Sequence, residues 1–266
     1  MKALVLALGV LSCSALGEPA AQIDISKLPP LSKMIDQVVV PVPSEIFGVL
    51  DKLGKPHWED VLRPVDHAKP IGEQAQVALL LGTVIAEGFV AVEAENVDEV
   101  KKIGRAVLTL SEAIGVRKAV LKRSKSISDF ADKKEWSAVR TELDGALSDV
   151  KEAMLELKSE QMSQLVSLGG WLRGTEALTT VVSKSFTKDG AELLHQPVLL
   201  DYFERQIAAM RPKIKANSVV SKVQKGLIEI RPLVGLTDGT AISEKSVKEI
   251  AAIARELIRA IYSKAG

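Results

Sequence analysis

The chain has 266 residues, of which 47% are hydrophobic and 4% aromatic, and 35 basic residues face 34 acidic ones for a formal net charge of +1. A balanced charge argues against a general nucleic-acid-binding protein. The scarcity of aromatic rings argues against a carbohydrate-binding module, and the single cysteine excludes a disulfide framework within the chain.

The first 17 residues have the features of a bacterial secretory signal peptide. Lys2 precedes an apolar stretch, and small residues follow up to Gly17. Because signal peptidase accepts only small side chains next to the scissile bond, we expect cleavage between Gly17 and Glu18. The protein would then be exported to the periplasm or the extracellular space without its cysteine. The alternative is a degenerate lipobox that ends at Cys13 and leaves a membrane-anchored lipoprotein.

The next segment, residues 18–43, is predicted to be a proline-rich N-terminal tether. Its prolines prevent a long helix, although Leu31–Val39 has room for one or two helical turns. A first clear helix is expected over Ser44–Gly54, with serine as its N-cap and glycine as its stop. Lys55–Pro64 then predicts a short, proline-bounded helix that covers the core with Trp58.

A nearly continuous apolar run, Ala75–Val92, predicts a helix from about Gly72 to Glu95 that is buried on most of its circumference. Its small residues lie on one side, where a neighbouring helix can approach closely. Its polar residues Gln76, Thr83 and Glu87 fall with Ala94 in one narrow strip, the only part expected to face water or another polar element.

The rest of the chain predicts further amphipathic helices, because apolar residues recur at spacings of three and four. Asn96 is a good N-cap for the next helix, which Gly115 ends. The expected helices cover residues 96–114, 117–131, 134–158, 161–186 with a break at Gly169-Gly170, 189–194, 197–210, 213–230 and 243–263.

These segments together predict an all-α fold, a multi-helix bundle of about eight to ten helices around the central apolar helix. No segment shows the alternation that marks a strand convincingly. Residues 44–266 are expected to form a single helical domain, and a subdivision near residues 187–190 is left open.

No catalytic motif is recognisable in the sequence. The three histidines are too few and too scattered for a zinc hydrolase, and neither HExxH nor GxSxG occurs. A polar cluster in the proline-rich segment is interpreted as a solvated loop rather than as a metal site: His57, Glu59, Asp60, Asp66 and His67. We therefore expect no catalytic residue, metal or cofactor.

One weak candidate ligand site consists of Glu87, Arg173 and Glu176. Arg173 and Glu176 lie among residues that otherwise favour burial, and Glu87 is the only charge within the apolar run. A buried Arg173 would need a carboxylate partner, for which Glu87 is the candidate. Three interpretations remain open: side chains that reach solvent, a structural ion pair, and a ligand site between helices.

A second candidate is a basic face between positions 205 and 225, which we define as Arg205, Arg211, Lys213, Lys215, Lys222 and Lys225. Such a face suits an anionic lipid surface, cell-wall carboxylates or an acidic partner. Residues 129–160 are acidic, so balance within the surface or self-association also explains both features.

The sequence therefore favours a non-enzymatic exported protein that binds a protein or cell-envelope partner, or serves as a scaffold. The alternative is a small-molecule-binding protein or enzyme with a site between helices near Arg173, Glu176 and Glu87. A third interpretation, a bundle that inserts its apolar helix into a membrane, is weakest because Glu87 interrupts the run. We expect no nucleic-acid partner and no membrane span in the mature chain, and the oligomeric state stays open.

Overall fold

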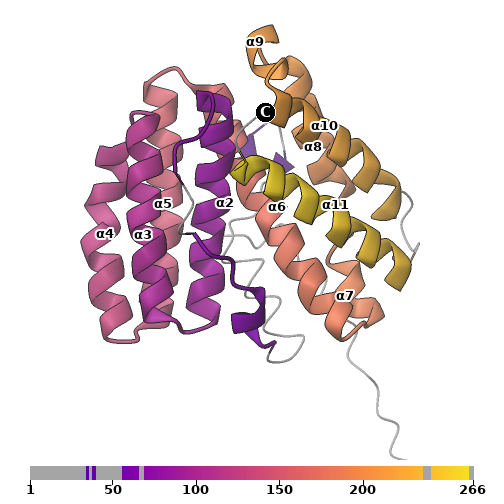
Figure 1. Ribbon diagram of the computed structural model, residues 1–266, viewed down its shortest axis with the longest axis horizontal. Helices are drawn as coiled ribbons and strands as arrows, with labels where there is room; N and C mark the ends of the chain where they lie inside the picture. Colours follow the sequence, from indigo (N-terminus) through magenta and orange to yellow (C-terminus); the bar gives the residue numbers. More distant parts are fainter. Residues whose placement is uncertain (1–33, 36–37, 40–55, 66–68, 236–240, 264–266) are drawn as a thin grey trace, which may run out of the picture.

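The structure, a computed structural model, describes residues 34–35, 38–39, 56–65, 69–235 and 241–263 (Figure 1). The expected all-helical bundle is confirmed. Its α-helices are α2 (Gln74–Glu93), α3 (Val97–Ala113), α4 (Arg117–Asp132), α5 (Trp136–Glu156), α6 (Glu160–Lys184), α7 (Lys188–Glu192), α8 (Pro197–Ala209), α9 (Pro212–Lys215), α10 (Ser218–Ile230) and α11 (Glu244–Tyr262). Two short 3-10 helices, η3 (Trp58–Val61) and η4 (Arg231–Leu233), accompany them.

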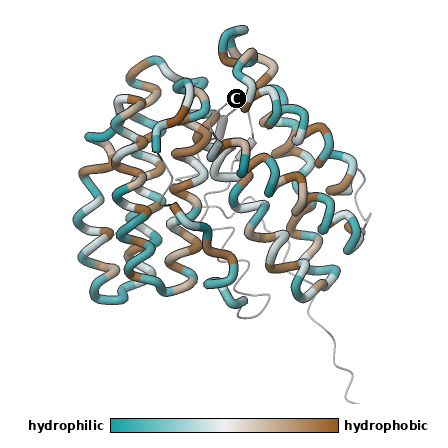
Figure 2. The backbone as a smooth tube through the Cα atoms, viewed as in Figure 1, coloured by the Kyte–Doolittle hydropathy of each residue, from teal (hydrophilic) through white to brown (hydrophobic). Residues whose placement is uncertain are grey.

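The helices form two groups that meet at α2 and α6. In Figure 1, α3, α4 and α5 lie on one side of α2, and α6 to α11 lie on the other. Helix α2 packs against α6 and α3 most extensively, and it also contacts α5, α10, α11 and η3. The outer helices alternate hydrophilic and hydrophobic residues along their length, as expected for helices with one buried face (Figure 2).

Helix α2 is buried over its whole circumference, from Ala75 to Val92. It is long and apolar enough to cross a membrane, and within the fold the protein itself covers it completely. Three residues of its polar strip, Gln76, Thr83 and Glu87, are 0% exposed. The strip therefore faces other polar elements rather than water. Gln76 donates to the carbonyl oxygens of Ile261 and Ser263 at the end of α11.

Glycines allow α2 and α6 to approach each other at backbone distance. A Cβ atom on Gly82 would lie 1.9 Å from the carbonyl oxygen of Val166, and one on Gly169 would lie 2.0 Å from that of Leu79. The small-residue side predicted for α2 thus performs the expected function. The predicted break at Gly169-Gly170 is wrong, because α6 runs through it without interruption. The glycines are there for close packing, not for a turn.

Four turns of the same type connect α2 to α3, α3 to α4, α4 to α5 and α5 to α6. Each ends its helix with a residue at positive φ: Glu95 (51°), Gly115 (80°), Lys134 (58°) and Lys158 (54°). In each turn the next residue donates its N–H to a carbonyl five residues back, for example Asn96 to Ala91 at 3.0 Å. This is the Schellman motif, which satisfies carbonyls at a helix end within a tight turn.

Helix boundaries agree with the sequence to within a few residues, with two exceptions. Asn96 caps α3 as predicted, because its Oδ1 accepts from the N–H of Glu99 at 3.0 Å. The helix expected over residues 213–230 is divided into α9 and α10, because Asn217 leaves the helix and caps α10 by accepting from the N–H groups of Val219 and Val220.

The second exception lies in the N-terminal tether. Instead of helical turns, Met34–Ile35 (β1) and Val38–Val39 (β2) pair as two short antiparallel strands, with Met34 opposite Val39. Adjacent β-branched residues such as Val38 and Val39 favour extended backbone over helix. The predicted helix over Ser44–Gly54, the leader up to Gly17 and Cys13 lie outside the described residues.

Candidate functional site

The three predicted site residues meet in the core, and a fourth charge joins them. Glu87 comes from α2, and Arg173 and Glu176 come from one face of α6. Arg63 follows η3 in the irregular segment that packs across both helices. Glu87 and Arg173 are 0% exposed and Glu176 is 4% exposed. We call these four residues, Arg63, Glu87, Arg173 and Glu176, the buried charge network.

Arg173 uses all three of its guanidinium nitrogens inside the network. Nε donates to Glu87 Oε2 at 2.5 Å, and Nη1 donates to Glu176 Oε2 at 3.0 Å. Nη2 donates to the backbone carbonyl of Val61 at 2.7 Å. The fixed fork of a guanidinium suits this arrangement, because its donors point in divergent directions within one plane.

Arg63 completes the network from the opposite side. Its backbone N–H donates to Glu87 Oε1 at 2.6 Å, and its Nε donates to Glu176 Oε2 at 2.8 Å. Its Nη2 forms an ion pair with Glu176 Oε1. Every carboxylate oxygen of Glu87 and Glu176 therefore accepts at least one hydrogen bond, and the two cations balance the two anions.

The electrostatics of the network favour its charged form. Burial acts to raise the pKa of Glu176, but the hydrogen bond from Arg63 and the charges of Arg173 and Arg63 outweigh it, so that this pKa lies below its usual value. The hydrogen bond to Glu176 in turn raises the pKa of Arg63, against the opposing effect of burial. Glu176 and Arg63 thus each favour the charged form of the other.

Tyr262, at the end of α11, lies beside the network without joining it. Its hydroxyl group is buried and has no hydrogen-bond partner among the described residues. Burial first, and then the negative charge of Glu87, raises the pKa of this phenol well above its usual range. The hydroxyl is therefore neutral, and it is a buried polar atom beside the network that has no hydrogen bond within the described chain.

The sequence correctly paired Arg173 with Glu87, and the interpretation that Arg173 and Glu176 reach solvent is wrong. The structural ion pair is present, while a ligand role for Glu87, Arg173 and Glu176 stays a prediction. Arg63 was missed, because the helix predicted over Lys55–Pro64 is too short for its apolar pattern to show which side chains are buried. Charge counting was the only available signal: two buried carboxylates and one arginine require a further cation.

The polar cluster near His57 does not form a metal site within the described residues, where no group of three or more metal-ligating side chains occurs. Asp60 forms an ion pair with Lys184 on α6 at 2.7 Å instead. The hydrogen bond and charge of Lys184 lower the pKa of Asp60. Asp66 and His67 lie outside the described residues.

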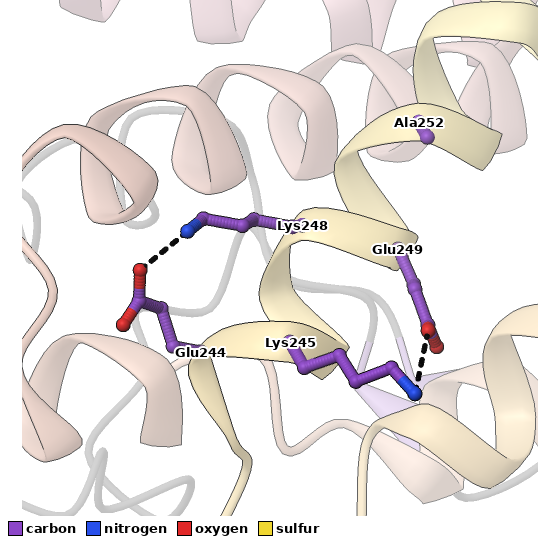
Figure 3. Close-up of a pocket in the computed structure, with 5 residues that line it drawn as sticks. All are labelled: Glu244, Lys245, Lys248, Glu249 and Ala252. Carbon is purple, nitrogen blue, oxygen red and sulfur yellow. Dashed lines mark hydrogen bonds and ion pairs between the residues drawn. The ribbon is translucent and has the colours of Figure 1, made fainter.

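A depression of about 490 Å³ lies on the outer face of α11, lined by Glu244, Lys245, Lys248, Glu249 and Ala252 (Figure 3). Lys248 pairs with Glu244 at 2.5 Å, and Lys245 pairs with Glu249 at 3.6 Å. These are (i, i+4) pairs along one helix, which leave no charge directed into the depression. Nothing in this surface distinguishes it as a binding site.

The predicted basic face extends over α8, α9 and α10. Arg205, Arg211, Lys213, Lys222 and Lys225 are exposed and Lys215 is half-buried. Lys222 pairs with Glu256 at 2.8 Å. Three other members bond to neutral oxygens: Arg205 to the carbonyl of Asp201, Arg211 to the amide of Gln161 and Lys215 to the carbonyl of Ala208. Their charges are thus not neutralised by these contacts.

Comparison with known proteins gives no match: no family model, no curated protein and no solved structure is significantly similar to this chain.

Proposed function

We propose that this chain is an exported helical protein of the periplasm or cell envelope that acts as a non-enzymatic binding or scaffold module. Export rests on the signal-peptide features of residues 1–17, and a lipoprotein anchored through Cys13 is the alternative form. The partner would be a protein or another component of the envelope.

The observation that carries this proposal is that every carboxylate oxygen of Glu87 and Glu176 and every guanidinium nitrogen of Arg173 has a partner within the chain. A catalytic or ligand-binding side chain needs an atom free to face the substrate. The partners include two backbone groups, the carbonyl of Val61 and the N–H of Arg63. This favours a structural role, in which the network fastens the segment after η3 to α2 and α6.

One observation favours the alternative, a small-molecule-binding protein or enzyme with a site beside Arg173, Glu176 and Glu87. The hydroxyl of Tyr262 is buried there without a partner in the described chain, and a bound ligand is one way to satisfy it. The side chain of Arg63 is 27% exposed and would form the outer edge of such a site.

Replacement of Tyr262 by phenylalanine separates the two functions, with native mass spectrometry and chemical denaturation as measurements. For a scaffold we expect no bound small molecule, and Tyr262→Phe should leave the free energy of unfolding unchanged or raise it, because it removes an unsatisfied polar group. A stoichiometric ligand that is present in the unaltered protein and absent from Tyr262→Phe would refute the scaffold proposal. Intact mass of the exported protein tests cleavage after Gly17 against lipidation at Cys13.

A photo-crosslinking residue placed at Lys225 tests the binding function itself, with the same residue at Lys118 on α4 as control. Both lysines are exposed, and they lie in different helix groups. A binding module should give crosslinks to an envelope component from position 225 and none from position 118. Equal crosslinking from both positions, or none from either, would contradict the proposal.

A further inference from the structure

We propose that the basic face on α8, α9 and α10 binds the anionic headgroups of a phospholipid surface. This inference names the partner class of the binding function proposed above and rests on that function. Between Arg205 and Ile228 the chain carries six basic residues and no acidic residue. Helices α8, α9 and α10 lie together at one edge of the molecule in Figure 1, so these charges gather in one region.

Within the described chain, few of these six charges form ion pairs with carboxylates, although Glu229 lies exposed one turn after Lys225 on α10. Only Lys222 among the six has a carboxylate as ion-pair partner there, Glu256. Lys213 and Lys225 are exposed and have no carboxylate within 4 Å among the described residues. Concentrated, unpaired positive charge on one face attracts an anionic surface through several weak contacts at once.

At least three of the nine acidic residues in the stretch 129–160 are engaged in ion pairs within the chain, which makes a second copy of the chain a less suitable partner at these positions. Carboxylates of residues 129–160 form ion pairs within the chain: Asp132 with Lys101 at 2.5 Å, and Asp149 and Glu142 with Arg123 at 2.9 and 3.4 Å. Self-association through these groups would have to break existing pairs. The proposal therefore assigns the anionic complement of the basic face to another molecule.

Exposed apolar side chains on the same helices favour a lipid surface over an acidic protein. Val198 at the start of α8 is 62% exposed, and Ile228 on α10 is 55% exposed. Lys222, Lys225 and Ile228 recur every three residues and share one side of α10. Lysines beside an exposed aliphatic group match a bilayer interface, where phosphates meet the ends of the acyl chains.

The test is flotation with vesicles of phosphatidylglycerol and phosphatidylcholine, compared with vesicles of phosphatidylcholine alone. The protein is the full chain as the host processes it, and Lys213→Gln/Lys225→Gln is compared with the matched control Lys118→Gln/Lys122→Gln on α4. All four lysines are exposed, and both variants change the net charge equally. Because the leader is the same in each protein, differences between them report on the basic face.

We expect binding only to the anionic vesicles, and binding that weakens as salt screens the charges. Each basic residue near an anionic membrane contributes a factor of about five to partitioning. The variant Lys213→Gln/Lys225→Gln should therefore bind about 25-fold more weakly, while the control should change less than about twofold.

Three results would overturn the lipid assignment. They are an equal loss in both variants, equal binding to both kinds of vesicle, and absence of vesicle binding. In the last case, soluble polyglutamate that binds the unaltered protein but not Lys213→Gln/Lys225→Gln would assign the face to an acidic polymer or protein. The binding function proposed above would then stand without its lipid partner, so that the two failures are distinguishable.

Discussion

Removal of the Arg173 guanidinium tests whether the buried charge network stabilises the fold. In Arg173→Met, Glu87 keeps only the N–H of Arg63 as a partner and stays at a site that is 0% exposed, while the carbonyl of Val61 loses its donor. Breaking one side of a buried ion pair typically costs about 3–5 kcal/mol. For a domain of this size that loss lowers the melting temperature by roughly 10 °C or more.

The exposed pair of Arg117 and Glu112 supplies the control, since its side chains are 42% and 66% exposed. Arg117→Met should cost less than about 1 kcal/mol in urea denaturation. Adding Glu87→Gln to Arg173→Met should recover part of the lost stability. The substitution removes the buried charge that has lost its partner, and the glutamine amide oxygen can still accept a hydrogen bond from the backbone N–H of Arg63. If Arg173→Met loses no more stability than Arg117→Met, the network contributes little and the reasoning is refuted.

Three further outcomes are expected. Gly82→Ala should lower the free energy of unfolding by about 3 kcal/mol or more, because its methyl group would overlap the carbonyl oxygen of Val166. The control Gly104→Ala, whose methyl group would have nothing within 4 Å, should raise the free energy of unfolding by about 0.5–1 kcal/mol. Comparable urea midpoints for the two variants would contradict the close contact. Lys134→Gly, at φ 58°, should raise stability by about 0.5 kcal/mol because glycine adopts this conformation without steric cost, as thermal denaturation can show. Because the pKa of Glu176 is lower in the folded protein than its unfolded value of 4.5, the charged side chain stabilises the fold above that pH, and this contribution is lost as the pH falls through the folded pKa. If the urea midpoint of Glu176→Gln depended on acidic pH in the same way as that of the unaltered protein, this expectation would be contradicted.

Periodicity predicted the helical fold well because a buried face leaves a regular trace in sequence. The stripe of α11 is an example, since Val247, Ile250, Ala254, Leu257 and Ile261 recur at spacings of three and four and are all buried. The same reasoning cannot say what covers a polar strip. Thr83 was placed correctly on the polar side of α2, but its partners, the carbonyl oxygens of Leu79 and Gly169, depend on how closely α6 approaches.

The sequence was ambiguous where one residue type can have two structural roles. Gly169-Gly170 signals a helix stop in isolation and a helix contact when another helix crosses at backbone distance. Asn217 is tolerated within a helix and also caps one, and here it caps α10. Only the tertiary arrangement decides between the two purposes.

The buried charges follow from packing an irregular segment against two helices. The backbone groups in the middle of α2 and α6 are satisfied within each helix, so an apolar interface between the two would need no charge. The segment from Val61, the last residue of η3, to Arg63 lacks such internal partners for two backbone groups, and its Val61 carbonyl and Arg63 N–H point into the core. An apolar replacement of Glu87 and Arg173 would leave both backbone groups unpaired at about 1–3 kcal/mol each, so the usual tolerance for replacing a buried ion pair with hydrophobic residues does not apply. The network therefore serves to fasten this segment, and substitutions in it should change stability, whereas substitutions in the basic face should change binding.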